Sequence, residues 1–217
     1  MQNQIQNVSI SDQITLENPN KIAWGPSNLL AIASENIVTI YHTLNNKLKI
    51  FNKIIKHKAK ITSLSWNFPT IEFHKLNSFD ILLAVGDEDG NCLIYDLFSL
   101  SRRGGISPSS CSTSLSILDI KWKIDDPSTL FILTAQPSLL SISVGTAESL
   151  GRSKMKLTPI NSNSYHSINI SLLWIQNIES GYKRISLDLF DPNRILITSP
   201  QTFNYFAIKI SFKSRQN

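Results

Sequence analysis

The sequence predicts an all-β protein built from a repeated unit of short strands. The chain has 217 residues, of which 41% are hydrophobic and only 17% are charged. Short runs rich in Ile, Leu, Val and Thr recur along it, separated by Asn, Asp, Gly, Ser and Pro, whereas helical spacing of apolar residues is nearly absent. Because β-branched side chains are stiff at χ1 and pack well on a pleated surface, these runs favour strands.

Four similar units follow one another along the chain. Each begins with a strand that ends in an aromatic residue, and polar turn residues then lead into a second and a third strand. The second strands are predicted at 29–34, 81–86, 129–135 and 194–199, and the third at 37–43, 91–97, 139–144 and 203–210. The aromatic residues are Trp24, Trp66, Trp122 and Phe190. Because they recur at equivalent positions, we expect them to form the core between neighbouring units.

Antiparallel units of about forty residues are typical of the blades of a β-propeller. A single blade cannot bury both of its faces, and radial stacking on its neighbours does so, which explains the repetition. We therefore predict a polar segment over 1–20, a partial propeller over 21–212 and a tail over 213–217. The propeller would contain about four four-stranded antiparallel blades, near 21–55, 57–110, 115–180 and 182–212.

Two long stretches, 99–116 and 157–181, separate the later strands. The first contains Arg102 and Arg103 followed by two glycines and has the composition of a surface loop. Phosphorylation of its serines, which would order the loop beside these arginines, is the alternative. The second stretch contains Trp174 in an apolar run, which fits either the outer strand of the third blade or a strand-rich insertion.

The second unit carries the most informative motif. His57 precedes the strand at 61–66, and about thirty residues later comes the stretch Ala84–Asp96, which reads AVGDEDGNCLIYD. This pattern resembles the WD-repeat family, with His57 in the place of the family's histidine and Asp89 as its turn aspartate. Tyr95 and Asp96 replace the closing Trp-Asp pair. The resemblance implies that these residues form a buried hydrogen-bonded network within the blade.

The match departs from the family pattern at two further positions of this unit. Lys56 replaces the glycine before His57, and Val85 stands where the family has a serine. A tyrosine hydroxyl can still bond in such a network, whereas Val85 cannot. The other three units keep only the apolar pattern, so the resemblance rests chiefly on the second one.

The resemblance covers about residues 20–212 and implies a non-catalytic protein-interaction scaffold with other proteins as partners. Within the WD-repeat family, the order of features is most similar to the N-terminal propeller of a long cytoplasmic scaffold that helps to capture vesicles at the trans-Golgi network. A location in the cytoplasm, peripheral at the trans-Golgi network or on vesicles, follows from that similarity. Because propellers close with four to eight blades, and this family usually with seven, we expect an N-terminal piece of a longer protein or a truncated gene product. Self-association through open blade edges is the alternative.

The basic residues suggest a second kind of partner. The net charge of +5 is mild and spread along the chain, which argues against a dedicated nucleic-acid surface. A candidate contact for an acidic partner or, weakly, for an anionic membrane consists of Lys53, Lys56, Lys58, Lys60, Arg102 and Arg103. A basic-surface binder of nucleic acid or anionic lipid is therefore the alternative to the scaffold.

The sequence predicts no catalytic, metal-binding or cofactor-binding residues, and hence no enzyme and no cofactor. His57 and Asp89 have no Gly-x-Ser-x-Gly nucleophile elbow to accompany them, and the glycines do not have phosphate-binding spacing. The remaining histidines and the two cysteines lack the spacing of metal ligands. Asp125 and Asp126 precede a proline, which favours a turn over a pair of acid and base catalysts.

Overall fold

The computed structural model describes residues 19–44, 47–67, 81–97, 102–107, 116–145, 169–191, 193–199 and 205–209. The predicted terminal segments, Cys111, and two of the histidines, His74 and His166, lie outside these ranges. Most of the serine-rich stretch around 108–115 lies outside them as well. Within them, the chain forms fifteen β-strands and two short 3-10 helices, η1 (Pro19–Lys21) and η2 (Pro26–Asn28).

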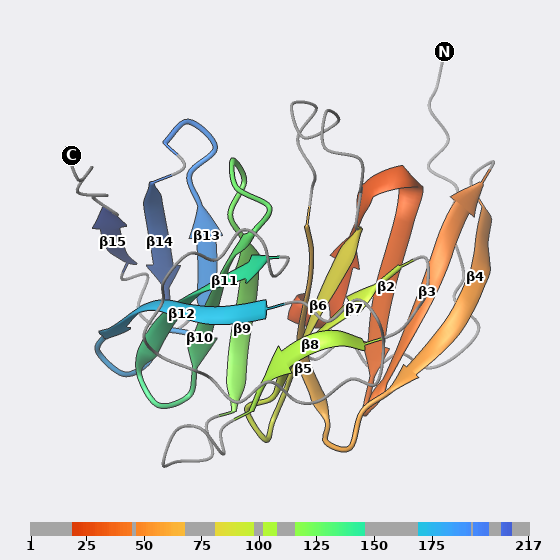
Figure 1. The fold of residues 1–217 in the computed structure, drawn as a ribbon, viewed down its shortest axis with the longest axis horizontal. Coiled ribbons are helices and arrows are strands. Elements are labelled where there is room, and N and C mark those ends of the chain that lie inside the picture. Colours follow the sequence, from red (N-terminus) through yellow and green to blue (C-terminus); the bar gives the residue numbers. More distant parts are fainter. Residues whose placement is uncertain are drawn as a thin grey trace.

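The strands form four consecutive antiparallel sheets, which we call blades 1 to 4 (Figure 1). Blade 1 contains β1 (Ile22–Trp24), β2 (Leu29–Ser34), β3 (Ile37–Leu44) and β4 (Lys47–Lys56). Blade 2 contains β5 (Ile61–Trp66), β6 (Leu82–Asp87), β7 (Cys92–Asp96) and β8 (Arg102–Ile106). Blade 3 contains β9 (Ile117–Trp122), β10 (Thr129–Thr134), β11 (Ser138–Gly145) and β12 (Asn169–Asn177). Blade 4 contains β13 (Arg184–Leu187), β14 (Arg194–Thr198) and β15 (Tyr205–Lys209).

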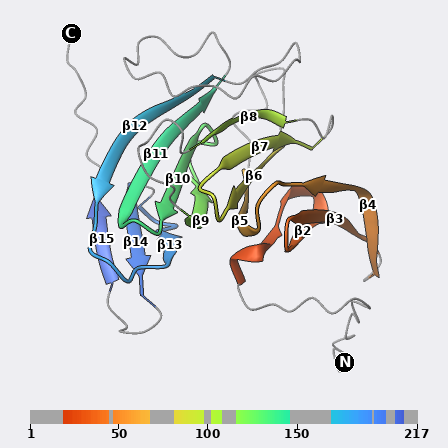
Figure 2. The ribbon, with the colours of Figure 1, turned by 90° about the horizontal axis from the view of Figure 1, so that it is seen from below.

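The blades follow one another in chain order as an arc. The first strands, β1, β5, β9 and β13, contact one another in succession, whereas β4, β8 and β12 lie on the outer side (Figure 2). In the part of the chain that the structure describes, the arc is open and does not close into a ring. The predicted all-β class and the antiparallel blades of a partial propeller are thereby confirmed.

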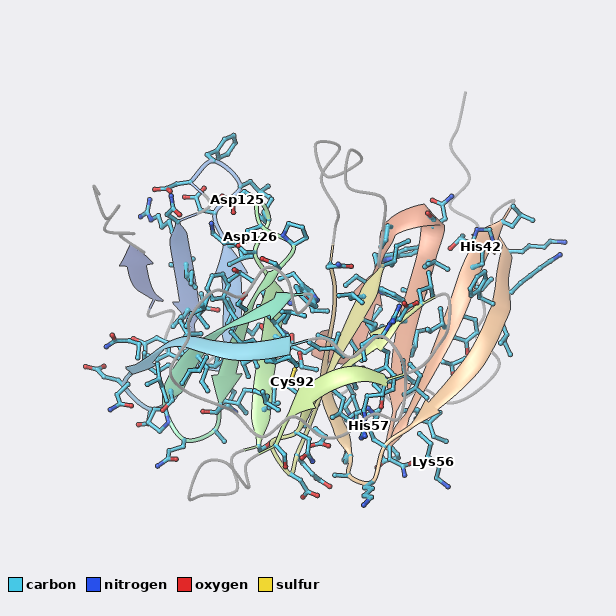
Figure 3. All side chains as sticks on the ribbon, in the orientation of Figure 1. His42, Lys56, His57, Cys92, Asp125 and Asp126 are labelled. Carbon is cyan, nitrogen blue, oxygen red and sulfur yellow. The ribbon has the colours of Figure 1, made fainter. Side chains whose placement is uncertain are left out.

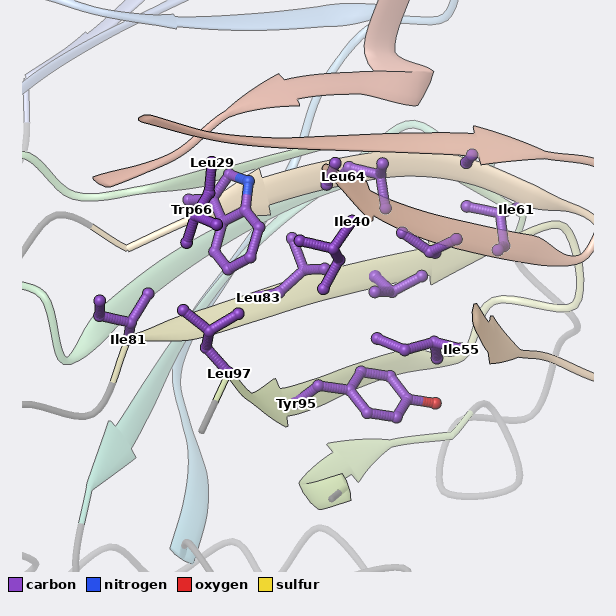
Figure 4. Close-up of a cluster of buried hydrophobic side chains, with 14 residues drawn as sticks. Leu29, Ile40, Ile55, Ile61, Leu64, Trp66, Ile81, Leu83, Tyr95 and Leu97 are labelled. Carbon is purple, nitrogen blue, oxygen red and sulfur yellow. The ribbon is translucent and has the colours of Figure 1, made fainter. Parts of the chain in front are cut away.

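Alternating side chains build one core at each junction between blades. Leu29, Ala31 and Ala33 of β2 face blade 2, where they pack with Leu83 of β6 and Trp66 (Figure 4). The opposite face of blade 2 packs on blade 3, and a third core joins blades 3 and 4. Full burial of an Ile or Leu side chain stabilises a fold by about 1.5–3 kcal/mol, so these three cores hold the arc together.

The structure corrects one predicted loop and settles the alternatives left open for Trp174. Arg102–Ile106 is a strand, β8, which pairs with β7. Gly105 allows a close approach of the two strands, because a Cβ atom on it would lie 2.5 Å from Cδ2 of Leu93. Trp174 lies in β12, the outer strand of blade 3, opposite Ser141.

Candidate functional site

A buried polar network lies inside blade 2, around His57. The loop that carries His57 is fixed by Asn36, whose carbonyl accepts the His57 N–H at 2.8 Å and whose side chain donates to the His57 carbonyl at 3.0 Å. The His57 Nε2 atom lies 3.1 Å from the Tyr95 hydroxyl, and Nδ1 lies 3.6 Å from Oδ2 of Asp87. All three side chains are buried. The network therefore connects the β4–β5 loop to β6 and β7.

Asp87, rather than the predicted Asp89, is the carboxylate beside His57. Asp87 is the last residue of β6 and its side chain is buried, whereas Asp89 lies in the turn that follows and is exposed. The Asp87 Oδ1 atom also accepts the N–H of Asn91 at 2.8 Å, and Gly90 allows the tight turn with a φ of 82°. Residues two apart on a strand share one face, but Asp89 lies beyond the end of β6, where the turn takes it away from the buried face that Asp87 occupies.

Asp96 belongs to a different contact from the one predicted. It accepts a hydrogen bond from Nε of Arg103 at 2.9 Å and a second from the same guanidinium, so it ties β7 to β8. Tyr95 and Asp96 are neighbours in β7 and therefore point to opposite faces of the sheet. Arg103 consequently supports the outer strand of blade 2, which corrects its predicted role as a contact for anions.

The protonation of Tyr95 follows from its burial. Desolvation, together with the nearby Asp87 carboxylate and against the opposing charge of Arg102, raises the pKa of Tyr95 from 10.0 to about 12. The phenol is therefore protonated at neutral pH and can donate to Nε2 of His57, which leaves the Nδ1–H of His57 to face Asp87. Such a hydroxyl is a poor nucleophile and a poor base, so the arrangement serves to hold strands together.

A second buried carboxylate, Asp119 of β9, links three blades. Its Oδ1 atom accepts the Ser63 hydroxyl of blade 2 at 3.3 Å, and Oδ2 accepts the Ile185 N–H of blade 4 at 2.8 Å. The Ile120 N–H also donates to Oδ1, at 2.8 Å, and Lys121 Nζ lies 3.3 Å away. Desolvation raises the pKa of Asp119 against the opposing effects of Lys121 and these bonds. Sequence reasoning missed this role, although a lone carboxylate within a run of apolar strand residues was a visible signal.

Two of the four strand-end aromatic residues occupy the predicted cores. Trp66 is buried between blades 1 and 2, and its Nε1 donates to the Ala23 carbonyl at 3.0 Å. Trp122 is buried between blades 2 and 3 and donates in the same way to the Ser65 carbonyl at 3.0 Å. Each tryptophan thus binds the residue just before the equivalent tryptophan of the preceding blade.

Trp24 and Phe190 do not occupy such cores, and the prediction for them was wrong. Phe190 is 97% exposed, in the turn between β13 and β14. Its place is taken by Leu187, which pairs with Ile195 just as Trp122 pairs with Leu130. Trp24 is 59% exposed, and among the described residues no blade precedes blade 1 to cover it.

The basic cluster is exposed and extends further along blade 1 than predicted. Lys56 is exposed next to the buried His57 (Figure 3). Lys58 is exposed on the other side of His57, and Nζ of Lys60 lies 3.4 Å from Oε1 of Glu35. The side chain of Lys53 lies outside the described residues. The structure adds Lys47 and Lys49, which are exposed on β4. The same hairpin exposes three large apolar side chains, those of Leu44, Ile50 and Phe51.

The remaining acidic pair, Asp125 and Asp126, lies in the turn between β9 and β10 and makes local contacts there. Burial opposes ionisation of Asp126, but hydrogen bonds from Ser128 and Thr129 lower its pKa overall. Asp125 forms an ion pair with Lys123 at 2.8 Å. Among the residues described, no three His, Cys, Asp or Glu side chains gather as a metal site would require, and no helix could span a membrane.

Comparison with known proteins identifies the fold. No family model and no curated protein matches the chain. Among solved structures, it is similar to the C-terminal WD40 domain of Sif2, with a TM-score of 0.53 and 15% identity, over 85% of this chain and 43% of that one. It is also similar to the β-propeller domain of Cps50 (Swd1) from Myceliophteria thermophila, with a TM-score of 0.53 and 10% identity, over 83% and 48%. The chain thus spans less than half the length of either structure, and its four blades have the fold of a WD40 β-propeller.

Proposed function

We propose that the chain is a non-catalytic scaffold that binds other proteins through the loops and outer edges of its blades. The observation that carries this proposal is that the buried polar side chains bond to one another and to neighbouring strands. His57, Asp87 and Tyr95 join strands within blade 2, and Asp119 joins three blades, so these groups serve the frame. Exposed charged and apolar side chains lie instead on the outer strand of blade 1, where a partner can reach them.

We further propose that this scaffold works in vesicle tethering at the trans-Golgi network. Support comes from the sequence, which resembles the N-terminal propeller of WD repeat-containing protein 11. The supporting stretches are Ile22–Gly25, Lys56–Ala59, Asp89-Gly90 with Tyr95-Asp96, Leu118–Trp122 and Ile185–Thr198. Proteins similar to this one are cytoplasmic scaffolds that help golgin-bound tethering factors to capture vesicles. The partners on this proposal are such tethering factors.

Localisation and partner capture test this proposal together. The full chain, expressed with a fluorescent tag, is expected to overlap with a trans-Golgi marker and to purify with golgin-bound tethering factors. A Lys56→Glu/Lys58→Glu variant, which reverses charge at exposed sites, is expected to lose the tethering factors. The matched control is Lys183→Glu/Arg184→Glu, which reverses two exposed charges on blade 4. A diffuse chain that captures no tethering factor would contradict the proposed place of action.

A second candidate function, contact with an anionic membrane, is favoured by the distribution of charge. Residues 19–60 contain seven lysines and one glutamate, a net +6, whereas the rest of the chain has a net −1. Lys47, Lys49 and the exposed Phe51 lie at alternate positions of β4 and so share one face, which presents cationic and apolar side chains together. Each lysine near an anionic surface contributes about 1 kcal/mol of binding, and the apolar side chains would add burial in the lipid.

Vesicle flotation separates this candidate from the first. Wild-type chain is expected to float with phosphatidylserine vesicles, but not with phosphatidylcholine vesicles, and to dissociate as salt is raised. Lys47→Glu/Lys49→Glu is expected to abolish flotation, whereas the control Lys183→Glu/Arg184→Glu is expected to retain it. Equal flotation of both variants would contradict the assignment to β4. A gel shift with nucleic acid at two salt concentrations tests the remaining anionic partner.

A further inference from the structure

Two of the three junctions between blades, those of blades 1 with 2 and 2 with 3, share one polar contact. The indole at the end of the first strand donates backwards to a main-chain carbonyl of the preceding blade. Trp66 does so to Ala23, and Trp122 does so to Ser65. Blades 2 and 3 therefore present an indole N–H towards their predecessor, and blades 1 and 2 a carbonyl acceptor towards their successor, whereas blade 4 has Leu187 at the indole position.

The first end of the arc has an indole without an acceptor. Trp24 pairs with Leu30 as Trp66 pairs with Leu83, so it occupies the equivalent position in blade 1. Its ring is 59% exposed, and among the described residues nothing accepts its Nε1–H. A tryptophan N–H that is to be buried needs a hydrogen-bond partner, and the other two junctions show which one it takes.

The other end of the arc has the matching acceptor. The N–H of Asp188 donates to the Arg194 carbonyl as that of Gly25 donates to Leu29, so Asp188 corresponds to Gly25. The Ser186 carbonyl in blade 4 then corresponds to the carbonyls of Ala23 and Ser65. Because a carbonyl oxygen has two lone pairs, it can accept an indole in addition to a bond within the sheet.

The same correspondence places apolar side chains beside that acceptor. The ring of Trp66 covers Gly25 so closely that a Cβ atom there would lie 2.8 Å from it. An indole docked on blade 4 by the same rule would lie over Asp188. The next two residues, Leu189 and Phe190, are 76% and 97% exposed. In blade 2 the position equivalent to Gly25 is Asn67, and Trp122 still reaches the Ser65 carbonyl, so a side chain at this position is compatible with the docked indole.

We propose that two copies of this chain associate head to tail, with Trp24 of one copy docked on blade 4 of the other. The Trp24 Nε1 donates to the Ser186 carbonyl, and the ring packs against Leu189 and Phe190. Each copy carries one donor end and one acceptor end, so the same contact made twice closes a pair of copies. The pairing covers large apolar side chains at both ends, which otherwise face water. It continues the blade junction already present three times within the chain.

Light scattering of the full chain over about a hundredfold range of concentration tests the pairing. A mass of two chains, each of 24.4 kDa, is expected at the upper end. Trp24→Glu and Phe190→Glu are each expected to give monomers with an unchanged circular dichroism spectrum. Trp24→Phe, which keeps an aromatic ring but loses the N–H donor at both junctions of the pair, is expected to weaken the pair about 25-fold, or about fivefold per junction. The matched control is Ile50→Glu, an exposed apolar site on β4, which is expected to leave the pair intact.

Mixing the two glutamate variants tests the head-to-tail arrangement itself. A mixed pair keeps one intact junction, between Trp24 of one variant and Phe190 of the other, so an equimolar mixture is expected to regain a two-chain species. A symmetric contact of blade 1 with blade 1 would show no such rescue and would overturn the arrangement. A chain that stays monomeric throughout, or a pair dissociated by Ile50→Glu, would overturn the proposal, whatever its partners in vesicle tethering prove to be.

Discussion

His57, Asp87 and Tyr95 show, at the scale of single residues, how a blade accommodates polar groups in its interior. Each of them contacts at least one other member of the set, so none is buried without a partner. Leaving a buried donor or acceptor unsatisfied costs about 1–3 kcal/mol, which makes such a network sensitive to single substitutions. The role of each residue can therefore be separated by its effect on stability.

The two neighbouring aspartates of blade 2 should differ sharply. Asp87→Ala removes the acceptor of the Asn91 N–H and the carboxylate facing His57, so it is expected to lower the free energy of unfolding by about 1–3 kcal/mol. Asp89→Ala, at an exposed turn position, is expected to leave it nearly unchanged. Urea unfolding of both variants measures the difference. Similar losses for the two would restore Asp89 to the network.

The Tyr95 hydroxyl should make the fold sensitive to alkali. Because its pKa is raised to about 12 from 10.0, the folded chain holds this proton more tightly than the unfolded chain does. Its contribution to stability is therefore complete below pH 10 and is lost as the pH rises towards 12. Tyr95→Phe should cost about 1 kcal/mol at neutral pH, and its disadvantage should shrink above pH 10. Parallel stability profiles of the two proteins between pH 8 and 11 would contradict this.

Alanine and asparagine in place of Asp119 should differ in their effect on stability. Asp119→Ala leaves the Ile185 N–H without its acceptor and should cost about 1–3 kcal/mol, whereas Asp119→Asn keeps one oxygen and should cost less. Because the fold raises the pKa of this carboxyl above 3.8, it favours the protonated form. Wild-type stability, relative to the asparagine variant, should therefore rise as the pH falls through that raised pKa. If the stability of the wild type relative to Asp119→Asn instead decreased as the pH was lowered through that interval, the fold would favour the ionised carboxylate.

At the scale of elements, the pattern of apolar residues predicted most of the strands but neither β8 nor the contacts between blades. The strands β6 and β10, whose residues are all buried, were predictable because each is a continuous run of mostly apolar residues. The role of Asp119 was hidden because it depends on blades 2 and 4 lying on either side of β9. Strand β8 was missed because glycine normally disfavours a strand, and only the contact of Gly105 with Leu93 explains its presence there.

The fourth unit illustrates why equivalence by residue type failed. Phe190 was assigned to the aromatic position because it is the aromatic residue in that stretch, although it lies in a turn three residues beyond Leu187. Only the pairing of Leu187 with Ile195 identifies the equivalent position. The correct repeat thus depends on strand register, which the sequence of a single unit does not contain.

Substitutions at these positions separate the two assignments. Trp122→Ala empties a buried site between blades 2 and 3 and is expected to lower the free energy of unfolding by about 3–5 kcal/mol. Leu187→Ala should have a smaller effect in the same direction, because its side chain is only partly buried against the core of blades 3 and 4. Phe190→Ala, measured in a Trp24→Glu background that keeps the chain monomeric, should leave it nearly unchanged. A large loss from Phe190→Ala would return this residue to the core.

At the scale of the whole molecule, the arc resembles other repeat proteins in that each unit is stabilised chiefly by its neighbours. Blades 2 and 3 are packed on both faces by described blades, whereas blades 1 and 4 are packed on one. The local free energy of opening should therefore be highest in the middle of the arc and lowest at its ends.

Hydrogen exchange followed by mass spectrometry can measure this gradient directly. Amides of β6 and β10, whose side chains are all buried, are expected to exchange most slowly, and those of β3 and β14 faster, because their burial alternates. Association of two copies would cover the faces of blades 1 and 4 that have no neighbouring blade. Trp24→Glu should therefore accelerate exchange in β2 and β14 far more than in β10. Ile50→Glu, which leaves those faces paired, should not. Uniform exchange across all four blades in both variants would mean that the arc opens as one cooperative unit and that its ends gain nothing from a second copy.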